Sequence, residues 1–170
     1  MSLQPVLHPA VRPARETDVT IIRDLIIDLA TYERSAGEVR ITPEQLHATL
    51  FGPRPAAFAL VAQSANGDVV GFALYFLNFS TWAGVHGIYL EDLYVAPDHR
   101  RSGLGQALLR SLAAIAVHRG YARFEWSVLN WNQSSVDFYV AMGAEAMRDW
   151  TVYRLTGTAL ADAAAAAGDS

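Results

Sequence analysis

A glycine-rich turn is the feature of this sequence whose residue types and spacing most readily support chemistry. It spans residues 100–105, has the sequence RRSGLG, and lies between a strand-like run, LEDLYV, and an amphipathic run that begins at Gln106. A turn of this kind at the start of a helix presents unpaired backbone N–H groups at the positive end of the helix dipole, and glycine lets a phosphate approach the backbone closely. The turn therefore predicts a pyrophosphate site, although a purely structural glycine turn fits the spacing equally well.

Several other chemistries are disfavoured by the residues around this turn and in the rest of the chain. The turn lacks the Lys-Ser/Thr ending of a P-loop, and its glycines do not follow the G-x-G-x-x-G spacing of dinucleotide-binding folds. The chain has no cysteine, so a thiol nucleophile, a disulfide and a cysteine-bound zinc are excluded. The five histidines show no metal-ligand spacing with carboxylates, and we predict no metal.

The composition predicts one soluble, globular domain. Of the 170 residues, 52% are hydrophobic and 18% are charged, which is typical of a folded chain. The net charge of -4 and the scattered arginines indicate no nucleic-acid surface and favour small cationic partners. The sequence has no basic leader before an apolar core, and no apolar run approaches the length of about 18 residues that spans a bilayer, so we expect a cytoplasmic protein with no membrane partner.

A sheet and several helices must hold the turn in place, and the hydrophobic periodicity of the sequence predicts where they lie. Apolar residues recur at helical spacing in four segments, which predict helices at residues 16–34, 42–52, 103–120 and 132–142. Thr17 or Asp18 is the predicted N-cap of the first helix. Thr42, Pro43 and Gln45 predict a capping box at the start of the second.

Strands complete the predicted architecture. Apolar and alternating runs predict them at residues 11–15, 56–63, 69–77, 87–95, 122–129 and 150–155. Asn66-Gly67 predicts a hairpin turn, and therefore antiparallel pairing, between the second and third strands. The order of elements predicts an α/β fold, with a mixed sheet and helices on its faces. We expect a disordered lead-in at residues 1–10, a single domain at residues 11–156 and an alanine-rich tail at residues 157–170 that frays.

The run of strand, turn and helix resembles the acetyl-CoA motif of the GNAT superfamily of N-acetyltransferases. A second segment, NWNQSSVDFYVAMGA at residues 130–144, resembles the part of that family that completes the CoA side. The likeness is greatest to the diamine acetyltransferase subgroup, the spermidine/spermine and thialysine enzymes, and it also includes LIIDLATYE, VVGFALYF and Trp82. The resemblance implies the GNAT fold, in which a mixed, largely antiparallel sheet has helices on both faces and its parallel central strands splay apart at the CoA site.

The resemblance implies that acetyl-CoA is the acyl donor and that no metal takes part. The pantetheine arm would lie along the central strand like an added strand, and the pyrophosphate would bind the turn. The CoA-binding residues that it implies are Leu93, Tyr94, Val95, Arg100, Arg101, Ser102, Gly103, Leu104, Gly105, Gln106, Asn132 and Ser135.

Glu91 and Tyr139 are the catalytic residues that the resemblance implies. An alkylamine has a pKa of about 10, so a carboxylate such as Glu91 can assist by removing its proton. The leaving thiolate needs a proton, which a phenol such as Tyr139 can donate. Direct attack on the thioester requires no acyl-enzyme. Spacing alone favours a core aromatic role for Tyr139, and Glu91 and Asp92 are expected to face opposite sides of the sheet because they are adjacent in a strand.

The acceptor implied by the resemblance is a primary amine of a small cationic metabolite, such as a diamine, a polyamine or a thialysine-like amino acid. The implied acceptor-binding residues are Tyr32, Glu33, Glu91, Asp92, Glu125, Trp126 and Ser127. A solvated helix end for Tyr32 and Glu33, and core packing for Trp126, are the alternative interpretations. The relatives also imply a homodimer.

The acceptor and the activity stay open at this level. The stretch around Ser80 is neutral where the relatives tend to carry an acidic residue, so a short diamine or a lysine analogue fits as well as a long polyamine. N-acetylation of a protein or peptide is a second possibility, and a non-catalytic CoA-binding module is a third, because a fold does not determine a function.

Overall fold

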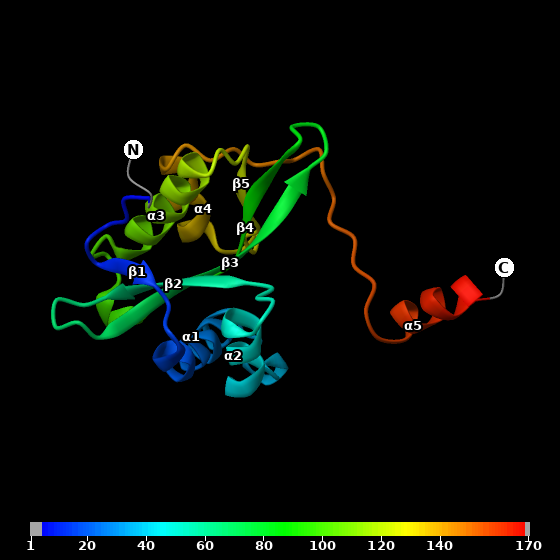
Figure 1. Cartoon of the computed structure of the whole chain (residues 1–170), viewed down its shortest axis with the longest axis horizontal. Coiled ribbons are helices and arrows are strands. Elements are labelled where there is room, and N and C mark those ends of the chain that lie inside the picture. The colour runs from blue at the N-terminus through cyan, green and yellow to red at the C-terminus, as the bar shows by residue number, and fades with distance from the viewer. Residues whose placement is uncertain (1–4, 169–170) are drawn as a thin grey trace. The chain divides into compact units, whose positions relative to one another are not determined.

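The computed structural model describes residues 5–168 of the chain. The chain forms two compact units, Met1–Ser127, here called the sheet unit, and Val128–Ser170, here called the C-terminal unit. The sheet unit contains every strand found in the described residues (Figure 1). None of the helices within residues 5–168 is long and apolar enough to cross a membrane.

The sheet has five strands in the order β1-β2-β3-β4-β5. Their bounds are β1 (Val11–Pro13), β2 (Phe58–Gln63), β3 (Val69–Ser80), β4 (Val85–Val95) and β5 (Phe124–Trp126). The first three pairings are antiparallel, and β4 pairs with β5 in parallel. The predicted mixed, largely antiparallel sheet is therefore confirmed, including the hairpin whose Gly67 has the positive φ of +88° that such turns demand.

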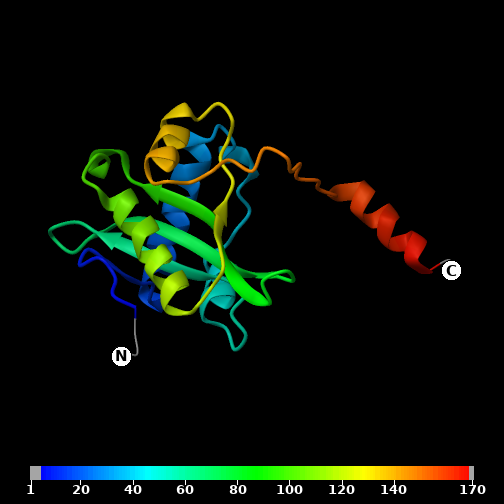
Figure 2. The ribbon, with the colours of Figure 1, turned by 90° about the horizontal axis from the view of Figure 1, so that it is seen from above.

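Helices cover both faces of this sheet. In the sheet unit they are α1 (Val19–Tyr32), α2 (Pro43–Phe51) and α3 (Leu104–His118), with short 3-10 turns η1 (Glu16–Asp18), η2 (Ala36–Glu38) and η3 (Pro97–His99). Figure 1 shows α1 and α2 on one side of the sheet and α3 on the other, and Figure 2 shows α3 crossing the sheet from above. The C-terminal unit contains α4 (Gln133–Ala141), α5 (Gly157–Ala165) and the turn η4 (Ala166–Gly168).

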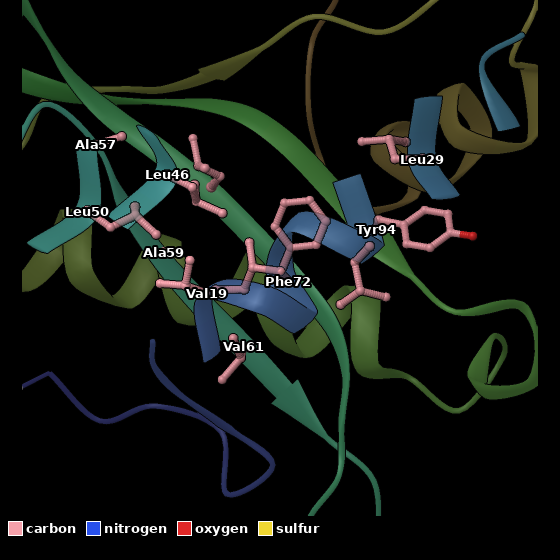
Figure 3. Packing of buried hydrophobic residues seen from close by; sticks show 12 residues of the cluster. Val19, Leu29, Leu46, Leu50, Ala57, Ala59, Val61, Phe72 and Tyr94 are labelled. Carbon is pink, nitrogen blue, oxygen red and sulfur yellow. The ribbon is translucent and has the colours of Figure 1, made fainter. Parts of the chain in front are cut away.

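The core beneath α1 and α2 fixes which strand residues face these helices. Val19 and Leu29 of α1 and Leu46 of α2 pack with Phe72 of β3 and Tyr94 of β4 in one buried cluster (Figure 3). Side chains two residues apart in a strand share a face, so the even-numbered residues of β3 around Phe72 point toward α1. This side is called the α1 face below.

The two predicted helix starts have different outcomes. At α2 the capping box is confirmed, because the Gln45 N–H donates to Thr42 Oγ1 (3.2 Å) and the Thr42 N–H donates to Gln45 Oε1 (3.0 Å). Asp18 precedes α1 as predicted but does not cap it. Its carboxylate instead accepts from the Arg12 guanidinium (2.6 Å and 3.0 Å) and from the Arg15 N–H (2.7 Å). Hydrogen bonding to Arg12 lowers the pKa of Asp18 and ties β1 to the start of α1.

Two strand predictions for the later part of the chain are wrong in whole or in part. The strand predicted at residues 150–155 is absent, and the strand predicted at residues 122–129 is only the three residues of β5. Both errors have one cause, since an apolar alternating run becomes a strand only where a neighbouring strand pairs with it. Within the described residues, the alanine-rich tail contains α5, none of whose residues is buried, as the high helix propensity of alanine allows. That this tail frays stays a prediction.

Candidate active site

A bulge in β4 lies at the pair of acidic residues that the sequence singled out. Asp92 pairs with Leu74 of β3, whereas Leu90 pairs with the next residue, Tyr75. Glu91 is therefore the extra residue of a β-bulge. Bulges redirect side chains, so the strict alternation predicted for Glu91 and Asp92 does not apply, and the prediction that they face opposite sides is wrong.

The bulge brings both carboxylates to the α1 face. Tyr89 stacks on its β3 partner Phe76 with ring centroids 5.1 Å apart, and the partner of Asp92 is Leu74, a member of the core under α1. Phe76 and Leu74 are two residues apart, so Tyr89 and Asp92 share the α1 face. Glu91 lies two residues after Tyr89 and therefore on the same face. The regular alternation of β4 is broken only between Glu91 and Asp92.

Glu33, directly after the last residue of α1, joins these two side chains in what we call the carboxylate cluster. Asp92 is half-buried, and its pKa is raised to about 6, first by burial and then by the negative charges of Glu91 and Glu33. Burial also raises the pKa of Glu33. The structure thus brings together three predicted acceptor-binding residues in an acidic site suited to a cationic ligand.

The titration of Asp92 predicts a pH-dependent stability effect. The pKa of Asp92 is about 6 in the folded chain and about 4 for an unperturbed aspartate, so the folded state loses stability as pH rises through this window, by at most about 3 kcal/mol. Asp92→Asn removes this titration. We expect the variant to be more stable than the wild type at about pH 8 and equally stable near pH 4, as measured by urea unfolding. Asp98→Asn, at an exposed position, is the control, and an Asp92→Asn gain of the same size at both pH values would contradict the prediction.

The glycine-rich turn has the backbone geometry expected of an anion site. Gly103 caps α3 with a φ of +84°, and Arg101 also has a positive φ, of 62°. The Ser102 hydroxyl donates to the His99 carbonyl (2.5 Å) and closes the turn. The first turn of α3 has no capping side chain and no acidic residue, and a Cβ added at Gly103 or Gly105 would meet nothing within 4 Å. No neighbouring atom thus crowds these two glycines, and the helix start keeps N–H groups without a side-chain cap, as an anion site requires.

β4 extends past the end of its pairing with β5. The parallel ladder joins Ile88–Leu90 to Phe124–Trp126 and stops there, whereas β4 continues to Val95. Leu93, Tyr94 and Val95 thus lie beyond the ladder, where the edge that leads to the glycine-rich turn has no strand partner in the five-stranded sheet. An extended arm can pair with such an edge as an added strand. The Tyr94 side chain itself is buried in the core under α1.

Arg100 connects the turn to the acceptor side. Its Nε donates to the Val95 carbonyl (3.0 Å), and its Cζ lies 4.9 Å from the ring centroid of Tyr32 and 5.2 Å from that of Tyr94. These are the distances of cation-π contacts. The sequence nominated Arg100 for CoA and Tyr32 for the acceptor, and the structure brings the two side chains together, so Arg100 ties the end of α1 to the start of the turn.

The residues nominated on and after β5 do not all join the carboxylate cluster. Glu125 Oε2 accepts from Asn78 Nδ2 (2.7 Å) and pairs with Arg123 Nε (2.9 Å). Trp126 follows Glu125 in the strand and therefore faces the other side of the sheet. Ser127 Oγ shares a hydrogen bond with the Tyr89 hydroxyl (2.8 Å). Sequence reasoning missed Arg123, whose only signal is its two-residue spacing from Glu125.

The remaining nominated residues lie in the C-terminal unit. Asn132 is the N-cap of α4, as predicted, and its Oδ1 accepts from the Ser135 N–H (3.3 Å). Tyr139 is half-buried on the same helix, with its ring centroid 5.5 Å from that of Phe138. Its role as a proton donor stays a prediction.

The part of the chain that the structure describes contains no metal-binding group of side chains. Within residues 5–168, no group of three or more histidine, aspartate or glutamate side chains is arranged to hold a metal ion.

Comparison with known proteins identifies the family. Residues 21–144, which include the carboxylate cluster, the turn and α4, match the Acetyltransferase (GNAT) family. The chain belongs to this family. GNAT enzymes use acetyl-CoA as the acyl donor, so the chain is an acetyl-CoA-dependent N-acetyltransferase, and the predicted fold class and enzyme class are confirmed.

Curated relatives extend over nearly the whole chain. Thialysine N-epsilon-acetyltransferase of Bos taurus is 38% identical over 164 residues, which cover 91% of this chain and 96% of the relative. L-ornithine N5-acetyltransferase NATA1 of Arabidopsis thaliana is 30% identical and covers 88% of this chain and 85% of the relative. An integron cassette protein from the mobile metagenome of V. cholerae has the same fold, with a TM-score of 0.76 at 24% identity over 91% of this chain and 96% of that one.

The turn of this GNAT chain predicts a specific effect on acetyl-CoA binding. Gly103→Ala places a side chain at a φ of +84°, which costs about 1 kcal/mol and shifts the N–H groups that begin α3. We expect the KM for acetyl-CoA to rise about tenfold with little change in the KM for the amine. Gly84→Ala is the matched control, because Gly84 has a φ of +68° with open space around it but lies in the β3–β4 hairpin. An equal rise of both KM values in both variants would contradict the assignment.

Proposed function

We propose that this enzyme acetylates a primary amine of a small cationic metabolite, of the diamine, polyamine or thialysine-like kind. The bulge at Glu91 carries this proposal, because it gathers three carboxylates from two elements on the α1 face. The relatives named for thialysine and for ornithine point to acceptors of the same chemistry. A short amine fits a cluster of this kind, since its positive end meets three negative groups, of which Asp92 and Glu33 are half-buried.

The proposed division of labour follows from the chemistry of each side chain. When bound, acetyl-CoA supplies an activated thioester. The backbone N–H groups at the start of α3 hold its pyrophosphate, and the backbone near Leu93 polarises the thioester carbonyl. Glu91 would take a proton from the ammonium group of the acceptor, and the free amine would attack the thioester carbonyl carbon to form the C–N bond. The nitrogen would then lose its second proton to solvent, and collapse of the tetrahedral intermediate would break the C–S bond. Tyr139 returns a proton to the departing sulfur.

The same proposal includes the arrangement of the whole protein. We place residues 128–156 in one GNAT domain with the strands, since the family match runs continuously to residue 144. A homodimer and a cytoplasmic location are further parts of the proposal. The homodimer rests on the likeness to the diamine acetyltransferases.

A thiol-release assay with acetyl-CoA and a panel of amines tests the proposed function. The panel contains putrescine, spermidine, thialysine, ornithine, lysine, an aminoglycoside and a lysine-containing peptide. We expect release with the small amines and none with the peptide. Release with the peptide alone would favour a protein acetyltransferase, and tight CoA binding without any release would favour a binding module.

A further inference from the structure

An ion pair in and beside β5 is not used by the chemistry described above. Arg123 Nε lies 2.9 Å from Glu125 Oε2, and the two side chains are 39% and 38% exposed. Asn78 Nδ2 donates to the same carboxylate oxygen at 2.7 Å. Among residues 5–168, the bonds of this pair use only Nε of Arg123 and Oε2 of Glu125, which leaves the terminal nitrogens of Arg123 and the other oxygen of Glu125 for a ligand.

The backbone makes room for this pair. A Cβ at Gly87 would lie 2.7 Å from Arg123 Cγ and 2.5 Å from Asn78 Oδ1, so the absence of a side chain there lets both residues lie across β4. An alanine at this position would displace them. The pair therefore depends on a feature of β4 and is more than a chance contact between neighbours in a strand.

The ion pair shares the α1 face with the carboxylate cluster. Glu125 pairs in register with Tyr89, and Asn78 lies on the same side of β3 as Phe76, the stacking partner of Tyr89. Asp92 lies three residues after Tyr89 in β4, and Glu91, between them, is the extra residue of the bulge. The pair extends along β4 from the level of Gly87, beside Arg123 and opposite Asn78, to the level of Tyr89, the register partner of Glu125. At a strand rise of about 3.3 Å per residue, Asp92 is roughly 7 to 10 Å from the Tyr89 level and roughly 13 to 17 Å from the Gly87 level along β4.

We infer that Arg123 and Glu125 together bind the zwitterionic head group of an amino-acid acceptor whose side-chain amine is acetylated. This inference rests on the proposed function. The terminal nitrogens of Arg123 match the α-carboxylate, and Glu125 matches the α-ammonium group. The chain from the α-carbon of lysine or thialysine to its terminal amine has five bonds, which span about 6 to 7 Å when extended. This length matches the shorter of the two separations, the one from the level of Glu125 to the carboxylate cluster.

The same pair discriminates against a simple diamine. The second ammonium group of a diamine needs a carboxylate that no cation already neutralises, whereas Arg123 already neutralises the charge of Glu125. A head group that carries both charges meets a partner for each. The structure therefore assigns substrate selection to this pair and amine activation to the carboxylate cluster.

The test compares lysine with cadaverine, which is lysine without its α-carboxylate. We expect the wild type to have the higher kcat/KM for lysine, and Arg123→Gln to lower that value about tenfold while changing the value for cadaverine less than about twofold. Arg123→Lys should recover part of the loss, because it restores the charge. Arg110→Gln is the control, since it removes the same charge from an exposed position on α3.

The outcomes separate this inference from the proposed function. An unchanged lysine-to-cadaverine ratio in Arg123→Gln, with both amines acetylated, would overturn the inference alone. An equal loss for both substrates would also overturn it, because that result indicates a structural role. No product from any small amine with the wild-type enzyme would overturn the proposed function and the inference together.

Discussion

Tyr139→Phe is expected to lower kcat at least about 100-fold while leaving the KM for acetyl-CoA nearly unchanged. The substitution removes only the hydroxyl group and keeps the ring, whose centroid lies 5.5 Å from that of Phe138 in α4. Without that hydroxyl, the thiolate of CoA leaves unprotonated, and the loss should grow as the thiol of the leaving group becomes less acidic. Steady-state kinetics of thiol release, measured by direct absorbance, checks this result.

The control for this variant is Tyr153→Phe. Tyr153 belongs to the same C-terminal unit and is 91% exposed, so loss of its hydroxyl should leave kcat unchanged. Equal kcat values for Tyr139→Phe and the wild type would contradict the proton-donor role and would return Tyr139 to the packing role that its spacing alone favours.

Glu91→Gln is expected to lower kcat/KM for the amine about 100-fold near pH 7, with a smaller loss at higher pH. Glutamine preserves the size of the side chain. Residue 91 lies in the bulge of β4 and is exposed, so the structure accommodates the substitution. The loss should shrink as pH approaches about 10, because an alkylamine then deprotonates without help. A pH profile of kcat/KM for the wild type and the variant measures this convergence.

The control here is Glu44→Gln, which removes an exposed carboxylate from the first turn of α2. Its profile should coincide with that of the wild type. A Glu91→Gln loss that stays constant at all pH values would contradict the base role and would indicate that Glu91 only attracts the cation.

Local signals explain why much of the fold could be predicted from the sequence. The capping box at Thr42, the hairpin at Gly67 and the start of α3 at Gly103 each depend on residues within a few positions of one another. The glycine-rich turn belongs to the same group, so its placement before α3 followed from the sequence. The family match to residues 21–144 agrees with these local elements.

Non-local geometry explains what the sequence could not predict. The bulge at Glu91 exists only in the register between β3 and β4, and alternation within β4 alone gave the wrong faces for Glu91 and Asp92. The contact between Arg100 and Tyr32 joins residues far apart in the chain. The elevated pKa of Asp92 requires burial together with Glu33, at the end of another element. Each of these features contributes to the site, and each depends on tertiary packing.

Direct transfer to the nitrogen of a small amine is tested most directly by following the acetyl group itself. The full-length enzyme is given acetyl-CoA labelled with carbon-13 in the acetyl carbonyl, together with thialysine or lysine, and the products are followed by NMR and intact-protein mass spectrometry. We predict that the label appears as an amide on the terminal amine of the acceptor, while the mass of the protein stays unchanged throughout turnover. Label retained on the protein, or the absence of an amide product with every small amine, would contradict direct acetyl transfer by this site.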